Sequence, residues 1–211
     1  MSGDDPRLTV LEGARAMDAA GLNPGTAGNT GLRHGEAVWI TPTGMAARDL
    51  VAEDICLVHP DGRSEGRRKP SSEWRLHTEV LAARLDLHAV IHTHAPFCSA
   101  LAVHSRGIPQ FHYMVALFGG TDVPCAPYAT FGEAALAEGV ARVMGDRKAC
   151  LMAHHGMLVA GETMAKAITH ATVLEELAEV YWRALQIGDP PLLDDAEMAR
   201  VVAKFSTYGQ Q

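Results

Sequence analysis

An apolar run at residues 87–94, LHAVIHTH, carries two histidines one residue apart. Its length and composition predict a buried β-strand. On a strand successive side chains face opposite sides, so His92 and His94 share one face with Val90, while Ile91 lies on the other. Both imidazoles could therefore reach one metal ion.

A second segment, AHHGM, strengthens the case for a metal site. Two histidines separated by one residue also occur by chance, and a single buried histidine is more often a hydrogen-bonded core residue than a metal ligand. Here His154 and His155 precede Gly156, which would let the chain turn sharply at the end of a strand. Because consecutive residues of an extended chain face apart, only one of the two histidines can complete a three-histidine site. Three neutral imidazoles with an open or carboxylate-filled position are typical of catalytic zinc, and the spacing of Cys98 and Cys125 does not recommend them as ligands.

Composition restricts the partners. The net charge of the 211 residues is -7, with no block of like charges, which argues against nucleic acid or an anionic membrane surface. The N-terminus lacks a basic region followed by an apolar one, and no apolar run is long enough to span a bilayer. The four cysteines are far apart and are expected to be free thiols in a reducing compartment. We therefore expect a cytoplasmic protein.

The order of the predicted elements favours one α/β domain over residues 1–211. Helices are predicted at 6–20, 71–86, 95–105, 132–146 and 163–188, and from Asp194 onward, where Glu197 completes a capping box. Short strands are predicted within 26–62, at 87–94 and 123–129, and as two segments of 149–161 hinged at His155 and Gly156. Strict alternation of strands and helices is absent, which favours a central, mainly antiparallel β-sheet flanked by helices.

The stretch KPSSEW suggests an anion site. Ser71 and Ser72 are predicted at the start of a helix, so their hydroxyls and the free backbone N–H groups suit a phosphate. Glu73 would bring a carboxylate close to that anion, an arrangement that needs a cation nearby. The alternative is a plain serine N-cap followed by an acidic first turn, which stabilises many helices without any function.

Two glycine-rich stretches, GLNPGTAGNTGLR and ITPTGM, could face the same anion. Gly28, Asn29, Thr43 and Gly44 offer backbone N–H groups and small polar side chains. The alternative is that both stretches are turns between short strands. Neither has the lysine of a P-loop nor the G-x-G-x-x-G spacing.

The combination of motifs is more specific than any one of them. The series GLNPGTAGN, ITPTG, PSSEWRLH, HTHA, FHYM, GG, PCAPYATFG, HHG and KFSTYG resembles the class II sugar-phosphate aldolases of the aldolase and adducin-like family, in order, over residues 5–209. Within that family the series resembles the L-fuculose-1-phosphate aldolases in particular. The resemblance implies a homotetramer with fourfold symmetry, an active site between adjacent subunits, and one Zn²⁺ per subunit held by Glu73, His92, His94 and His155.

The same resemblance implies roles for individual residues. Positions that hold the substrate phosphate match Gly28, Asn29, Thr43, Gly44, Ser71 and Ser72. Glu73 matches the acid/base residue, and Tyr113 of the neighbouring subunit matches the residue that handles the proton of the aldehyde oxygen. The aldehyde side matches Thr26, Phe131 and Tyr208, the last on a mobile C-terminal tail, 206–211, which ends in only GQQ after Tyr208.

The implied reaction is the reversible cleavage of a ketose 1-phosphate to dihydroxyacetone phosphate and an aldehyde. L-fuculose 1-phosphate and related pentulose or deoxypentulose 1-phosphates are the expected substrates. Alternatives on the same fold are an epimerase, a decarboxylase, a dehydratase or a non-catalytic adducin-like module. The epimerase branch usually carries Asp at the position of Glu73, and an adducin-like module would be expected to have lost metal ligands. A zinc hydrolase stays open as well, although it would leave the phosphate site and Tyr113 without a use.

Overall fold

The computed structural model describes residues 5–205, in which all strands belong to one sheet. The strands are β1 (Asn29–His34), β2 (Ala37–Ile40), β3 (Cys56–Val58), β4 (Ser64–Glu65), β5 (Ala89–Thr93), β6 (Cys125–Ala126), β7 (Ala149–Met152) and β8 (Gly156–Gly161). Their order in the sheet is β4-β3-β2-β1-β5-β8-β7-β6. Every neighbouring pair is antiparallel except β6 and β7, which confirms the mainly antiparallel α/β fold.

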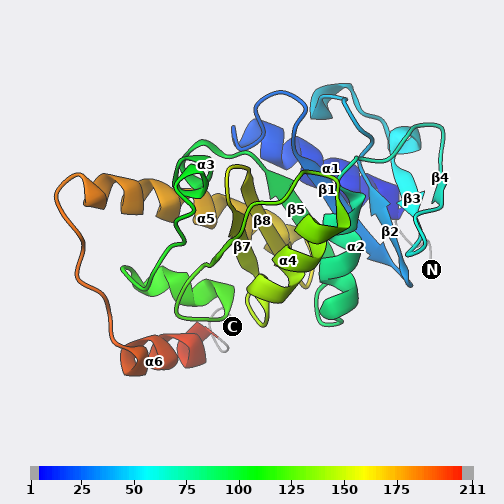
Figure 1. Ribbon diagram of the computed structural model, residues 1–211. Helices are drawn as coiled ribbons and strands as arrows, with labels where there is room; N and C mark the ends of the chain where they lie inside the picture. Colours follow the sequence, from blue (N-terminus) through cyan, green and yellow to red (C-terminus); the bar gives the residue numbers. More distant parts are fainter. Residues whose placement is uncertain (1–4, 206–211) are drawn as a thin grey trace.

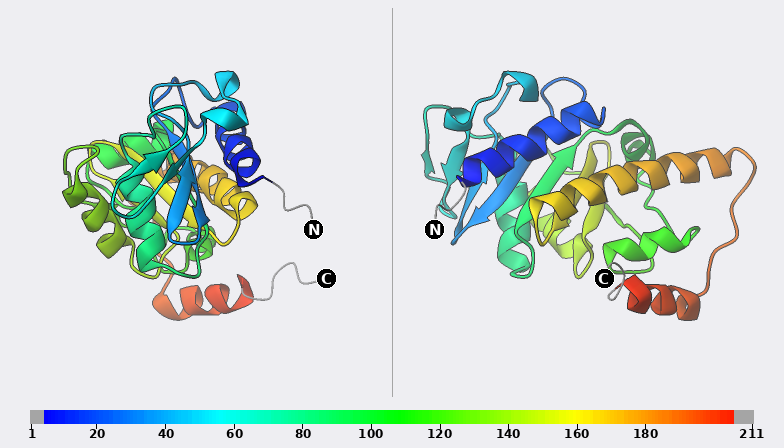
Figure 2. Two further views of the ribbon diagram at one scale, coloured as in Figure 1. Left: turned by 90° about the vertical axis from the view of Figure 1, so that its right-hand side faces the viewer. Right: turned by 180° about the vertical axis from the view of Figure 1, so that it is seen from behind.

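Helices cover both faces of the sheet (Figures 1 and 2). One face packs against α1 (Pro6–Ala19), α3 (Pro96–Val103) and α5 (Met164–Leu185), and the other against α2 (Trp74–Ala83) and α4 (Ala134–Met144). Three 3-10 segments, η1 (Ala47–Asp49), η2 (Ala52–Asp54) and η3 (Tyr113–Phe118), and a final helix, α6 (Asp195–Phe205), complete the described residues. All the predicted helices are present, most of them shorter than predicted, and no helix among the described residues is long and apolar enough to cross a bilayer.

The central strand β5 alternates between the two cores, as its sequence predicts. All five of its residues are buried. Ile91 packs in the core beneath α1, α3 and α5, whereas Val90 packs in the core beneath α2 and α4. Because side chains alternate along a strand, His92 lies on the same face as Val90. The strand ends at Thr93, so His94 follows it in a loop.

The start of α2 differs from its prediction. The serines were expected at the N-cap, but the helix begins at Trp74 and Glu73 is the N-cap residue. Ser71 lies before the helix because its N–H donates to the carbonyl of Thr41, at 3.0 Å. This bond is next to an isolated β-bridge between Pro42 and Pro70. The Ser71 hydroxyl still accepts a hydrogen bond from the Glu73 N–H, at 3.2 Å, so it orders the turn that leads into the helix.

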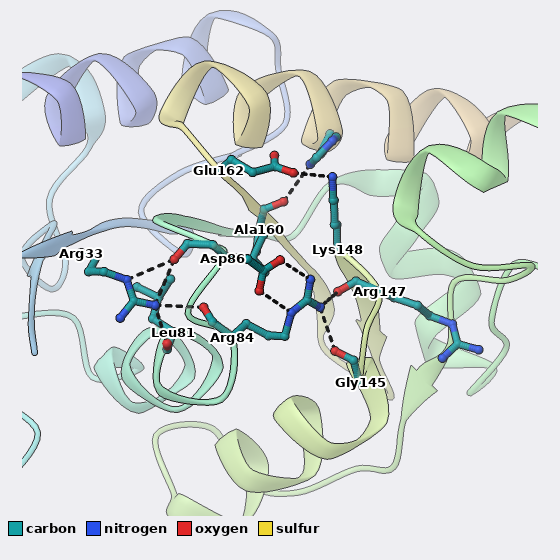
Figure 3. Close-up of polar contacts among 11 residues, drawn as sticks. Arg33, Leu81, Arg84, Asp86, Gly145, Arg147, Lys148, Ala160 and Glu162 are labelled. Carbon is teal, nitrogen blue, oxygen red and sulfur yellow. Dashed lines mark hydrogen bonds and ion pairs between the residues drawn. The ribbon is translucent and has the colours of Figure 1, made fainter. Parts of the chain in front are cut away.

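Two arginines fix the opposite end of α2 (Figure 3). Arg33 of β1 donates to the carbonyls of Leu81 and Arg84, which lie at the C-terminal end of the helix. Arg84 donates to the carbonyls of Gly145 and Arg147, at 2.9 and 2.8 Å, in the turn between α4 and β7. The bonds from Arg33 satisfy carbonyls that a helix end leaves without partners. Together these bonds fix the position of α2 on the sheet, and with it the position of the residues at its start.

The last helix packs away from the sheet. Asp194 caps α6 by accepting from the Glu197 N–H at 2.7 Å, which is one of the two bonds of the predicted capping box, while the Glu197 carboxylate accepts from Arg200 at 2.8 Å. The helix lies beside η3 (Figure 1), where the rings of Phe205 and Tyr113 are nearly parallel, with centroids 6.5 Å apart. The predicted mobile tail, 206–211, lies outside the described residues.

Candidate active site

Three imidazoles meet where β5 ends and β8 begins. They belong to His92, His94 and His155, and one ring nitrogen of each lies within 4.8 Å of the others. The Nε2 atoms of His92 and His94 are 3.2 Å apart. This cluster of three histidines is consistent with a site for a divalent metal ion, as predicted from the sequence.

A hydrogen bond to the neighbouring strand β8 fixes the orientation of the His92 ring. Its Nδ1 donates to the carbonyl of Met157 on β8, at 2.8 Å, and the ring is fully buried. A neutral imidazole that donates from Nδ1 keeps a lone pair on Nε2, the nitrogen that faces the cluster. The pairing of β5 with β8 therefore holds one ligand atom in place.

The structure decides between the two adjacent histidines. His155 faces the cluster, whereas His154 is exposed and has a left-handed φ of 56°. The sharp turn was expected at Gly156, but that glycine does not have a positive φ. It is required instead because a Cβ there would lie 2.5 Å from the Thr93 carbonyl oxygen.

Glu73 lies against the imidazoles. Its Oε2 is 3.2 Å from His92 Nε2, and its Oε1 is 3.2 Å from His155 Nε2. Burial of Glu73 raises the pKa of its carboxyl, but the contacts with His155 and His92 outweigh burial and hold the pKa below its ordinary value. Burial, together with the neighbouring imidazoles, lowers the pKa of His94 to about 4, so this ring is neutral at pH 7.

A metal ion fits this set of groups. Glu73 Oε1 is buried but accepts no hydrogen bond from the described residues. A buried carboxylate oxygen that accepts no hydrogen bond is costly, and a cation between it and the imidazoles would remove that cost. The donor set of imidazole nitrogen and carboxylate oxygen suits zinc and similar divalent ions.

The other carboxylate oxygen has a partner from β1. Asn29 Nδ2 donates to Glu73 Oε2 at 3.1 Å, and Asn29 Oδ1 lies 2.5 Å from His77 Nε2. Asn29 was predicted to contact phosphate, yet its side chain is buried and directed to the carboxylate. Sequence reasoning missed His77, although its position four residues after Glu73 is a signal that both could face the same side of a helix.

A cavity of about 480 Å³ opens beside the cluster. Its walls bring together most of the residues that were predicted to bind substrate or metal: Thr26, Gly28, Thr43, Gly44, Ser71, Ser72, Glu73, His94, His155 and Phe131. The bridge between Pro42 and Pro70 places the segments 43–44 and 71–72 next to each other. Small polar side chains thus gather on one wall, next to the imidazoles.

Two of the expected anion donors are already used inside the chain. The Gly28 N–H donates to Asn23 Oδ1 at 2.7 Å, and the Thr43 N–H donates to the carbonyl of Lys69 at 3.1 Å. These two N–H groups are therefore paired within the chain, and contact of Gly28 and Thr43 with an anion stays a prediction. A glycine is needed at position 28 because a Cβ there would lie 2.7 Å from the His92 carbonyl oxygen.

The rim of the cavity is aromatic and includes residues that the sequence did not single out. Phe131 and Tyr128 are both exposed and line the cavity together with His154. Tyr128 and His154 meet edge to face, with ring centroids 6.0 Å apart. Tyr128 follows the short strand β6 in an irregular segment, where no periodic pattern marks a side chain as facing a cavity.

Tyr113, by contrast, lies away from this cavity. It belongs to η3, with half of its surface exposed, and lines a groove shared with α6 rather than the cavity of its own chain. Tyr208 lies outside the described residues. Lys148 pairs with Glu162 at 2.6 Å near the turn between β8 and α5 (Figure 3).

Comparisons with known proteins agree with this geometry. The Class II Aldolase and Adducin N-terminal domain matches residues 9–182. A 5-methylthioribulose-1-phosphate/5-deoxyribulose-1-phosphate aldolase of Rhodospirillum rubrum is 52% identical over 203 residues, which are 96% of this chain and 92% of the relative. The L-fuculose phosphate aldolase of Escherichia coli K12 is 43% identical over 201 residues, or 95% of this chain and 94% of the relative.

A solved structure supports the same assignment. An L-fuculose 1-phosphate aldolase superimposes with a TM-score of 0.93 at 32% sequence identity, with 98% of each chain covered. Adducin-like modules were expected to lack metal ligands, but here three imidazoles meet beside a carboxylate. The chain therefore belongs to the class II aldolase and adducin family, within which it is a class II aldolase, a carbon–carbon lyase.

Proposed function

We propose that this aldolase cleaves a ketose 1-phosphate, reversibly, to dihydroxyacetone phosphate and an aldehyde. One observation carries the proposal. The cluster of Glu73 and three histidines borders a cavity whose lining includes the hydroxyl-bearing residues Thr43, Ser71 and Ser72. A site with a cationic centre beside small polar groups suits a substrate that carries a ketone and a phosphate on neighbouring carbons.

Zn²⁺ is the proposed ion, one per subunit, with Glu73, His92, His94 and His155 as ligands. When bound, it would act as a Lewis acid that stabilises the negative charge developing on the ketone oxygen during cleavage. The donor set, and the buried Glu73 Oε1 that accepts no hydrogen bond from the described residues, support this assignment. No lysine Schiff base is needed for such chemistry.

Glu73 is the proposed acid/base residue. Its carboxylate is ionised, because the imidazoles hold its pKa low, and it borders the cavity. In the synthetic direction, a carboxylate in this position would remove a proton from the carbon next to the ketone. Tyr113 of a neighbouring subunit is the proposed donor to the aldehyde oxygen, since a phenol carries a proton at neutral pH and an ionised carboxylate does not.

The phosphate is proposed to bind at the wall that includes Gly44, Ser71 and Ser72, with further contacts from Gly28, Asn29 and Thr43. The Ser71 hydroxyl accepts from the Glu73 N–H, so its own proton is available to an anion. Binding the phosphate away from the reacting carbons would position the ketone beside Glu73.

The substrates named for the relatives suggest a small apolar aldehyde. Carbon counting gives acetaldehyde from 5-deoxyribulose 1-phosphate and a methylthio-substituted acetaldehyde from 5-methylthioribulose 1-phosphate. The exposed rings of Phe131 and Tyr128 at the rim, with Thr26 in the same cavity, support such groups, and a contact from Tyr208 is proposed from the family resemblance alone. L-fuculose 1-phosphate, which leaves a hydroxylated aldehyde, is the second candidate because of the 43% identical relative.

A homotetramer with the active site between subunits completes the proposal. The position of Tyr113 outside the cavity of its own chain supports it. The four cysteines are free, which supports a cytosolic, reducing location.

A coupled assay for dihydroxyacetone phosphate tests the function. Purified enzyme is given a panel of ketose 1-phosphates, with and without a chelator, and inorganic phosphate is measured in parallel. We expect chelator-sensitive release of dihydroxyacetone phosphate, with the 5-deoxypentulose 1-phosphates preferred. Release of inorganic phosphate instead would identify a hydrolase. Consumption of the sugar phosphate without either product would indicate an epimerase, a dehydratase or a decarboxylase.

A further inference from the structure

A buried histidine that no proposed step uses lies behind the active site. His77 of α2 is fully buried, and its Nε2 lies 2.5 Å from Asn29 Oδ1. Asn29 in turn donates from Nδ2 to Glu73 Oε2 at 3.1 Å. The three side chains form one line of hydrogen bonds that ends on the proposed acid/base residue.

The groups at the two ends of this line, Glu73 and His77, determine which atom donates in each hydrogen bond. The ionised carboxylate of Glu73 can only accept, so the Asn29 NH₂ group must face it. The amide oxygen then faces His77, which must donate from Nε2. An Asn29 amide turned by 180° would direct its oxygen at the carboxylate, and the two oxygens would repel each other.

The surroundings of His77 leave it little freedom. A Cβ on the neighbouring Gly31 of β1 would lie 2.5 Å from His77 Nδ1, so the strand and the ring are in close contact. Burial lowers the pKa of His77 to about 3, with a further lowering from the nearby His92, and a neutral ring carries one proton. Nδ1 is buried and has no hydrogen-bond partner among the described residues. One ring nitrogen of His77 is thus left without a hydrogen bond, while the other contacts Asn29. A core residue with a purely structural role would not require this costly arrangement.

We propose that His77 is a positioning residue: it holds the Asn29 amide with its NH₂ group toward Glu73, and thereby orients the Glu73 carboxylate toward the metal. The inference rests on the proposed metal site. It assigns His77 no contact with substrate. A leucine or methionine in its place would fill a similar volume but would leave the Asn29 oxygen without a donor, and the amide would be free to turn.

The test compares two kinds of substitution at this position. His77→Leu removes the donor, whereas His77→Gln keeps an N–H near the position of Nε2. Zinc affinity is measured by competition with a chromogenic chelator, and kcat is measured per folded, zinc-loaded site. We expect His77→Leu to weaken zinc binding and lower kcat by about 10-fold each, and His77→Gln to restore most of both. If His77→Leu does not fold, His77→Met serves in its place.

A double variant tests the route through Asn29. In an Asn29→Ala background no amide remains to be held, so adding His77→Leu should cause no further loss of zinc affinity. His170→Leu is the matched control. His170 of α5 is another buried histidine, bonded through Nδ1 to the Ala160 carbonyl of β8, and its loss should lower thermal stability without changing zinc affinity.

Two results would overturn the inference. One is wild-type zinc affinity in both donor-free variants. The other is an equal loss of affinity from His77→Leu with and without Asn29. Because zinc affinity is measured without substrate, these results are independent of whether the enzyme acts as the proposed ketose-1-phosphate aldolase.

Discussion

His94 tests the metal cluster most directly, because it lies beyond the end of β5 and takes no part in the pairing of the strands. In His94→Ala we expect the loss of bound zinc and of aldolase activity, while the protein stays folded. Removal of one ligand from a set of four lowers the affinity, and the cavity beside position 94 lets water fill the space. Elemental analysis of the dialysed protein, together with circular dichroism, measures both outcomes.

The adjacent histidine provides the control for that experiment. His154 is exposed and is not part of the three-histidine cluster, so His154→Ala should keep its zinc. Full zinc occupancy in dialysed His94→Ala would show that His94 is not a ligand. Loss of zinc from both variants would instead point to a general disturbance of the hairpin.

Glu175 of α5 has a structural role that can be separated from the chemistry. Its buried carboxylate accepts from the N–H groups of Phe97 and Cys98, at 2.7 and 2.9 Å, at the start of α3. A negative charge at this helix end satisfies two donors and interacts favourably with the helix dipole. Glu175→Ala should therefore lower the free energy of unfolding by about 2 to 3 kcal/mol.

Urea denaturation measures this loss. The neighbouring Glu176 is exposed, and Glu176→Ala is the control, with an expected change within about 0.5 kcal/mol. Equal stability of the two variants would mean that the bonds to α3 contribute nothing net. Because α3 begins two residues after His94, we also expect Glu175→Ala to bind zinc more weakly than Glu176→Ala.

At the scale of elements, sequence patterns correctly predicted the features that depend only on neighbouring residues of the chain. The alternation along β5 predicted which side chains share a face, since the period of two is a property of the strand itself. The start of α2 was misplaced because Ser71 is a favourable N-cap type, yet its N–H donates to the carbonyl of Thr41, just after β2. That tertiary contact holds Ser71 outside the helix, which begins three residues later, at Trp74.

The junction between β5 and β8 makes a prediction for glycine substitutions. A Cβ at Gly156 would lie 2.5 Å from the Thr93 carbonyl oxygen and 3.1 Å from the His94 ring. Gly156→Ala must therefore separate the two strands where the metal ligands meet. We expect a loss of about 2 to 4 kcal/mol in the free energy of unfolding, together with weaker zinc binding. Thermal melts with and without zinc measure both effects.

Gly139 is the matched control because it lies inside α4, where a Cβ would meet nothing within 4 Å. Gly139→Ala should raise stability by about 0.5 to 1 kcal/mol, since alanine favours a helix over the unfolded chain. A Gly156→Ala protein as stable as the wild type, with unchanged zinc affinity, would contradict the close approach of the two strands.

At the scale of the whole molecule, the contacts between distant segments decide what the sequence alone left open. Which of the two adjacent histidines faces the metal depends on the hairpin between β7 and β8, whose left-handed residue is His154. The use of Asn29 to hold Glu73 depends on the pairing of β1 with β5, which puts Asn29 opposite His92. The spacing of residues within a single segment of the sequence cannot predict either arrangement.

The position of Tyr113 raises the question of what completes the site. Its ring stacks near Phe205 in the groove between η3 and α6, and the cavity beside the metal cluster does not include it. If Tyr113 donates the proton as proposed, it must do so in the cavity of another subunit. Closed rings of identical subunits allow this arrangement, since each interface can pair the cluster of one subunit with the groove of the next.

Mixed oligomers test that arrangement. Tyr113→Phe subunits keep the metal cluster, and His94→Ala subunits keep the tyrosine, so each variant alone should be nearly inactive. In coexpressed mixtures about one quarter of the interfaces should pair an intact cluster with an intact tyrosine, and activity should return to about that fraction of the wild type. A mixture of His94→Ala with His92→Ala is the control, because no combination restores a cluster. If tagged, purified mixed oligomers of the first pair stay inactive, Tyr113 does not act across an interface.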